Sequence, residues 1–156
     1  MGRLAQGVGT RIKGTYTIFF IKHSQVPKHK TVTYGRFVCD IRPQKAEKER
    51  MRLTVGGNLI NYDGDVSTQT GNLTTSTCLW NSVVSTPDAE YMCLDLKNFY
   101  LGTPMEEYEY MRLHISDIPD KIIQQYKLHE LTHNGLVHIE VRGGMYGLPQ
   151  AGKLSN

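Results

Sequence analysis

The strongest constraint on the fold is a pair of β-rich runs separated by a short charged segment. The runs are Thr31–Ile41 (TVTYGRFVCDI) and Arg50–Val55 (RMRLTV), and both are rich in the β-branched and aromatic residues that strands favour. Residues 42–49 (RPQKAEKE) between them are polar, and Pro43 has no N–H to donate to a strand pair. We therefore predict a β-hairpin whose charged tip reaches into solvent.

Four further segments have the composition of extended chain. They are Thr15–Lys22, Tyr91–Leu96, Glu107–Ile115 and Leu136–Val141, and the turn signal Asn134-Gly135 precedes the last of them. Because these segments do not alternate with helices at regular βαβ spacing, we predict an α+β fold.

Two segments predict helices. Apolar side chains recur at helical spacing over residues 74–84, before Pro87, and Trp80 is expected to anchor this helix in the core. A second helix is expected from about Pro119 to His129, with Ser116 or Asp117 as its cap.

The net charge of +3 conceals a strong partition along the chain. Residues 1–52 carry twelve bases and three acids, a net charge of +9, whereas the remainder carries a net charge of −6. A basic first third suggests an anionic partner. We expect residues 1–30 to be a flexible basic lead-in that precedes the folded domain.

Composition excludes several classes of protein. The longest apolar run, Ile18–Ile21, is far too short to span a membrane, and no signal peptide follows Met1. Three cysteines without a CxxC pair argue against a disulfide scaffold or a cysteine zinc site. We expect an intracellular chain that is not secreted and has no membrane partner.

Asp95 is the first candidate for chemistry. It ends an apolar run, where a carboxylate is held rigidly beside solvent and is able to coordinate a divalent metal. A lone Asp at a strand end more commonly caps the following turn. The residues alone leave both readings open.

The segment around Asp95 resembles a known motif. Residues 94–101 (LDLKNFYL), with Met105-Glu106-Glu107 and Tyr110-Met111 after them, are similar to the first catalytic aspartate motif of reverse transcriptases from copia-type LTR retrotransposons. Residues 145–151 (MYGLPQA) resemble the next landmark of these RNA-directed DNA polymerases, and residues 52–55 (RLTV) are similar to their fingers strand. The resemblance covers about residues 31–151.

The resemblance implies an incomplete right-hand polymerase, with a fingers β-hairpin and the start of a ferredoxin-like palm. It assigns residues 31–156 to a partial reverse transcriptase domain. The fingers would be about residues 31–88 and 113–149, and the palm about residues 89–112 and 150–156.

The resemblance also implies roles for individual residues in two-metal nucleotidyl transfer. Asp95 would bind both ions, Mg²⁺ or Mn²⁺, and the Leu96 carbonyl would help to hold the nucleotide metal. Tyr100 would pack below the sugar and exclude a 2′-hydroxyl, and Gln150 would touch the incoming nucleotide. The cations that would neutralise the triphosphate are Arg52, Lys45 and Lys48.

One departure from the family concerns catalysis. The family places two further aspartates in a Y-x-D-D hairpin beyond Gln150, and this chain ends at Asn156. We therefore expect a fragment that does not hold the metals stably and is inactive alone. The intact enzyme would use an RNA template, a DNA primer and deoxynucleotide triphosphates.

Without the C-terminal palm and thumb, the apolar segment around Asp95 should stay uncovered, so the chain should be marginally stable or associate.

Two other functions are compatible with parts of the sequence. The basic hairpin would also suit a non-catalytic module that binds nucleic acid. Residues 129–133 (HELTH) match the HExxH motif of zinc peptidases, which needs a continuous helix. Asn134-Gly135 ends that helix at once, and His138 and Glu140 are poorly spaced for a third ligand. We consider the peptidase the weaker alternative, and His23 and His29 suggest no metal site of their own.

Overall fold

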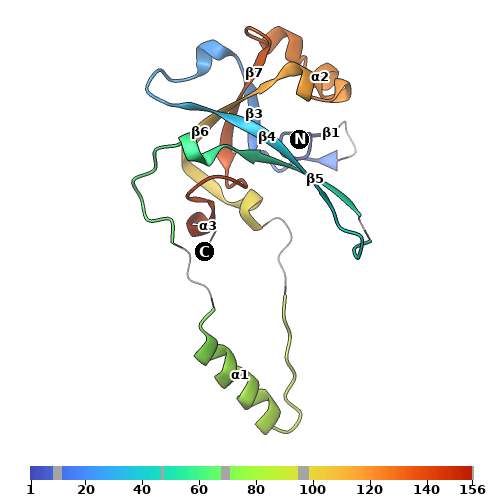
Figure 1. Ribbon diagram of the computed structural model, residues 1–156, viewed down its shortest axis with the longest axis vertical. Helices are drawn as coiled ribbons and strands as arrows, with labels where there is room; N and C mark the ends of the chain where they lie inside the picture. The colour runs from blue at the N-terminus through green and yellow to red at the C-terminus, as the bar shows by residue number, and fades with distance from the viewer. Residues whose placement is uncertain (9–11, 47, 68–70, 95–98, 156) are drawn as a thin grey trace.

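A five-stranded sheet forms the body of the protein (Figure 1). The computed structural model describes residues 1–8, 12–46, 48–67, 71–94 and 99–155. The strands, in their order across the sheet, are β3 (Ile18–Ile21), β7 (Leu136–Gly143), β6 (Pro104–His114), β4 (Val32–Ile41) and β5 (Glu49–Val55). Neighbouring strands are antiparallel except β4 and β6, which are parallel. The chain is thus of mixed α+β class, as predicted.

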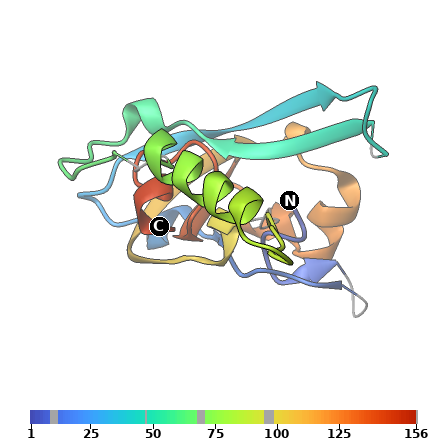
Figure 2. The same cartoon turned by 90° about the horizontal axis from the view of Figure 1, so that it is seen from below.

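The predicted hairpin is confirmed as β4 and β5. The two strands pair from Gly35 opposite Val55 to Ile41 opposite Glu49. Seen from below, they run as a long ribbon along one side of the molecule (Figure 2). Only the inner half of β5 reaches the core, where Leu53 and Val55 are buried. The charged outer half stands in solvent, as its sequence predicts.

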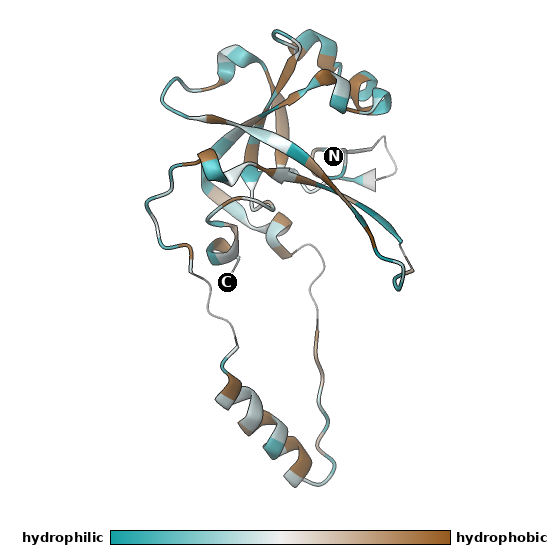
Figure 3. Ribbon diagram, viewed as in Figure 1, coloured by the Kyte–Doolittle hydropathy of each residue, from teal (hydrophilic) through white to brown (hydrophobic). Residues whose placement is uncertain are grey.

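The core lies on one face of the sheet. Alternate residues of β7, namely Val137, Ile139 and Val141, are fully buried, as the period of two in this strand requires. The short helix α2 (Asp120–Gln125) adds Ile122 and Ile123 to this core. Apolar residues accordingly concentrate in the central strands (Figure 3).

Helix α1 (Leu73–Ser85) forms as predicted but contributes nothing to the core. Asn72 caps it, since its Oδ1 accepts a hydrogen bond from the N–H of Thr74 at 2.8 Å. None of its residues is buried, and it lies away from the sheet (Figure 1). Trp80 was expected in the core and is instead 51% exposed, with its ring 4.3 Å from that of Tyr91. The helix carries apolar side chains, but no element that the structure describes buries them.

The strand predicted at Tyr91–Leu96 is not formed over residues 91–94. These four residues have no regular structure and are exposed, with Met92 76% and Leu94 71% accessible. A strand is stabilised by hydrogen bonds to a neighbour, and no strand of the described chain runs beside this segment. The predicted uncovered apolar segment is therefore present, but as irregular chain.

The second helix is shorter than predicted and capped differently. It ends at Gln125, because Lys127 adopts a left-handed conformation with φ of 50°, and the 3₁₀ helix η5 (Leu128–Leu131) follows. Ser116 and Asp117 were expected to cap it. They lie instead in a separate 3₁₀ turn, η4 (Ile115–Asp117), and Pro119 occupies the cap without a side-chain bond.

The expected lead-in, residues 1–30, does not stand apart from the domain. A small antiparallel pair, β1 (Gly7–Val8) with β2 (Ile12–Lys13), precedes β3. Ala5 and Ile18 are buried in the same core as the central strands, and the Ile18 N–H donates to the Leu4 carbonyl at 2.9 Å. A domain boundary at residue 31 would separate β3, an edge strand, from the rest of the sheet.

No helix among the described residues is long and apolar enough to cross a membrane.

Candidate functional site

A glycine-rich turn after β7 is fixed to the end of β5. The N–H of Val55 donates to the Tyr146 carbonyl at 2.8 Å. Gly147 has a φ of +95°, and a Cβ on it would lie 2.0 Å from the Val55 carbonyl oxygen. Likewise a Cβ on Gly57 would lie 1.9 Å from the Gly147 carbonyl oxygen. Only glycine permits both approaches, so the backbone itself holds this turn against β5.

The turn brings together side chains from three distant segments. The Arg52 guanidinium of β5 lies 5.4 Å from the centre of the Tyr146 ring, a cation–π contact. The ring of Tyr100, from the 3₁₀ helix η3 (Phe99–Gly102), meets Tyr146 edge to face at 5.4 Å and 83°. We call these three residues the Arg–Tyr cluster. It offers a positive charge beside two aromatic rings.

Gln150 lies at the end of the same turn, immediately before α3 (Ala151–Leu154). Its side chain is only 4% exposed. In the part of the chain that the structure describes, its Oε1 and the buried Nε of Arg52 have no hydrogen-bond partner. Buried polar atoms in native proteins are nearly always paired. The unpaired acceptor of Gln150, at the end of this turn, and the unpaired donor of Arg52, on β5 beside it, are therefore candidates for contact with a ligand.

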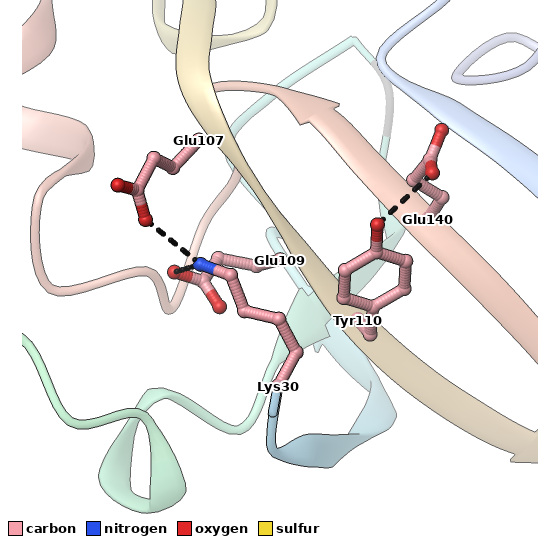
Figure 4. A network of polar contacts seen from close by, with 5 residues as sticks. All are labelled: Lys30, Glu107, Glu109, Tyr110 and Glu140. Atoms are coloured by element: carbon pink, nitrogen blue, oxygen red, sulfur yellow. Dashed lines mark hydrogen bonds and ion pairs between the residues drawn. The ribbon is translucent and has the colours of Figure 1, made fainter. Parts of the chain in front are cut away.

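A buried carboxylate supports Gln150. Glu109 of β6 is 8% exposed and accepts a hydrogen bond from the Gln150 side chain. Burial raises the pKa of Glu109, while the Lys30 ammonium 4.0 Å away and the bond from Gln150 oppose the rise. Lys30 also pairs with the exposed Glu107 at 2.9 Å (Figure 4). On the opposite face of the sheet, the Tyr110 hydroxyl donates to Glu140 at 3.2 Å (Figure 4).

Sequence reasoning missed Glu109 as the partner of Gln150, and Lys30 as a neighbour of Glu109. Glu109 alternates along β6 with the buried residues Met111 and Leu113, and alternate residues of a strand lie on the same face. This pattern indicates that the Glu109 side chain faces inward. Lys30 carries no comparable sign, because its position depends on the parallel pairing of β4 with β6.

The other predicted nucleotide contacts are not gathered at this site. Lys45 and Lys48 are exposed in the tip of the hairpin. Val55, which binds the turn, is at the other end of β5, about 20 Å from the tip at the usual rise per residue. Asp95 and Leu96, the proposed metal ligands, lie outside the described residues.

The geometry of the HExxH segment does not suit a zinc peptidase. His129 and Glu130 lie in the 3₁₀ helix η5, and His133 follows it in an isolated bridge to Leu136. The two histidines therefore do not share the face of one continuous α-helix, as the motif requires. No group of three His, Cys, Asp or Glu side chains among the described residues could hold a metal ion.

Comparison of the chain with family models, curated proteins and solved structures finds no match. The Arg–Tyr cluster, Gln150 and the sequence motifs that contain them are therefore the features that bear on function.

Proposed function

We propose that this chain forms the fingers and the opening of the palm of an RNA-directed DNA polymerase, similar to those of copia-type retrotransposons. One observation supports the proposal above the others. Arg52, Tyr100 and Gln150 were each singled out by a different motif, and they come from three segments far apart in the sequence. All three adjoin a single glycine-rich turn.

The arrangement suits the binding of a nucleoside triphosphate. The Arg52 guanidinium is positioned to neutralise phosphate oxygens, and its buried Nε retains an unused donor. The rings of Tyr100 and Tyr146 form an apolar wall against which a deoxyribose packs. The unpaired Oε1 of Gln150 is an acceptor for a nucleotide hydroxyl, and Glu109 fixes the amide from the other side.

Catalysis would need more carboxylates than these residues supply. In the intact family enzyme, three aspartates would hold two metal ions, which would supply positive charge to the primer 3′-oxygen and the departing pyrophosphate. Asp95 is the one residue of this chain that matches those ligands, and the 156 residues contain no Y-x-D-D string. We expect the chain to bind nucleotide but not to extend a primer by itself.

A second candidate is a non-catalytic module that binds nucleic acid through the hairpin. The observation in its favour is a set of exposed cations along β4, β5 and their tip, including Arg36, Lys45 and Lys48. Such a surface would bind phosphate backbones without regard to sequence, and its affinity would fall steeply with salt.

Binding of a fluorescent deoxynucleoside triphosphate to the full chain separates the two candidates. We expect Arg52→Ala to weaken binding by about tenfold or more, as loss of a charge-assisted contact does. Arg36→Ala, a change of the same charge on the exposed part of β4, should have little effect. Equal losses in both variants would favour the nucleic-acid module, and would contradict the proposed nucleotide site.

A further inference from the structure

Three histidine rings meet at the end of β3. His23, in the 3₁₀ helix η1 (His23–Gln25), stacks on His133 with ring centres 4.5 Å apart and planes 1° from parallel. The ring of His138 in β7 lies 4.7 Å from that of His23, and its Nε2 is 3.2 Å from Nδ1 of His23. We call these three residues the histidine cluster.

The cluster connects the edge of the sheet to its interior. β3 has four residues and is an edge strand of the described sheet, in which it pairs with β7 and Ile21 stands opposite His138. η1 follows β3 directly, and His133 belongs to the turn that enters β7. The ring contacts are thus an attachment of β3 and η1 to the sheet, additional to the backbone ladder.

The charged or titratable neighbours that lower the pKa of His138 are all bases. His23 comes from η1, His133 from the turn before β7, and Arg112 from β6, where it is paired with His138. η5 packs against both β3 and β7, and its titratable residues, His129 and Glu130, are exposed. His138 is 4% exposed, and its Nδ1 is without a partner in the residues that the structure describes.

Protonation of both His23 and His138 would break the hydrogen bond between their rings. The contact between Nδ1 of His23 and Nε2 of His138 is a hydrogen bond only while one of the two nitrogens lacks a proton. With both rings protonated, two N–H groups would face each other beside Arg112, while Glu140, the carboxylate two residues further along β7, is bonded to the side chains of Arg142 and Tyr110. Burial and these neighbouring bases lower the pKa of His138.

We propose that the histidine cluster is a proton-sensitive latch, which holds β3 and η1 on the sheet at neutral pH and releases them on acidification. This inference is independent of the proposed polymerase function. While β3 is attached, its surroundings disfavour a proton on His138. When β3 is detached, His138 takes up the proton near the ordinary histidine pKa of 6.5. The opening equilibrium should therefore rise as the pH falls through that value, by up to about tenfold per pH unit for each proton bound.

Hydrogen exchange of the full chain tests the latch. Protection of the amides in residues 18–21, corrected for intrinsic exchange, should fall by about tenfold or more between about pH 7 and about pH 5. The amides of β4 and β5 should keep their protection and serve as the internal reference. Unchanged protection of β3, or an equal loss in all strands, would overturn the proposal.

Variants identify the group that takes up the proton. His138→Gln should abolish the pH dependence at β3, and His129→Gln, an exposed histidine of η5, should preserve it. If His138→Gln does not fold, His23→Phe keeps an aromatic ring on His133 but removes the ring nitrogen that contacts His138, and it should weaken the pH dependence. If the variant that folds, His138→Gln or His23→Phe, shows the same pH dependence of β3 protection as the wild type, the latch is refuted. Stoichiometric zinc on the native chain that His138→Gln removes would also refute it, since the cluster would then be a metal site.

Discussion

Replacing Gly147 by alanine should detach the glycine-rich turn from β5. The Cβ of the alanine would lie 2.0 Å from the Val55 carbonyl oxygen, far inside van der Waals contact. The obstructing atom belongs to the backbone of a buried strand residue, so no side chain is able to rotate away. The residue would also keep a φ of +95°, which an L-amino acid adopts only with strain.

The cost follows from these two effects. Holding a non-glycine residue in such a conformation costs about 1–3 kcal/mol. If the turn moves to relieve the clash, it loses the hydrogen bond from the Val55 N–H to the Tyr146 carbonyl, which contributes about 1 kcal/mol. We therefore expect the free energy of unfolding to fall by about 2–4 kcal/mol. Tyr146 would move with the turn, so nucleotide binding should weaken as well.

Urea denaturation of Gly147→Ala measures the loss, and Gly71→Ala is the matched control. A Cβ on Gly71 would meet nothing within 4 Å, so this change should alter stability by no more than about 0.5 kcal/mol. Equal stability of the two variants would show that the turn does not approach β5 so closely. The proposal that this close approach positions the Arg–Tyr cluster would then be refuted as well.

Three other changes test separate parts of the structure. Burial raises the pKa of Glu109, so ionisation of its carboxyl opposes folding. The free energy of unfolding of the wild type, relative to that of Glu109→Gln, should therefore decline from about pH 4 to about pH 7. A difference between the two proteins that stays constant with pH in urea unfolding would contradict this. Tyr100→Ala should reduce the preference for deoxyribonucleoside over ribonucleoside triphosphates by roughly tenfold in the binding assay, and an unchanged preference would remove Tyr100 from the sugar site. Val84→Glu, on the exposed face of α1, should suppress concentration-dependent association in sedimentation while changing stability by less than about 0.5 kcal/mol; persistent association would place the contact elsewhere.

Features that depend on neighbouring residues could be predicted from the sequence. The β4–β5 hairpin follows from two β-rich runs and a short polar connection. Asn134 and Gly135 adopt φ values of 50° and 76°, as the turn signal before β7 requires. Helix α1 begins at its Asn72 cap for the same local reason.

Burial and pairing depended on partners that the local sequence does not specify. Trp80 and Met92 are apolar, and apolar residues are usually buried, yet they are 51% and 76% exposed, and Trp80 contacts Tyr91 and not the core. The left-handed Lys127 shortened the second helix without a glycine to signal it. The histidine cluster joins residues more than a hundred positions apart, so no spacing rule connects His23 with His138.

The construction of the Arg–Tyr cluster depends on glycines more than on charges. Gly144 lets the turn approach the backbone of Tyr100, where a Cβ would lie 2.4 Å from the carbonyl oxygen. Gly57 and Gly147 allow the corresponding approaches beside β5. A glycine carries no chemistry itself, but three positions that exclude a Cβ fix where Tyr100, Tyr146 and Arg52 meet. The spacing of glycines in residues 143–147 (GGMYG) was therefore as informative about the site as any charged residue, because it indicated where separate segments of backbone would touch.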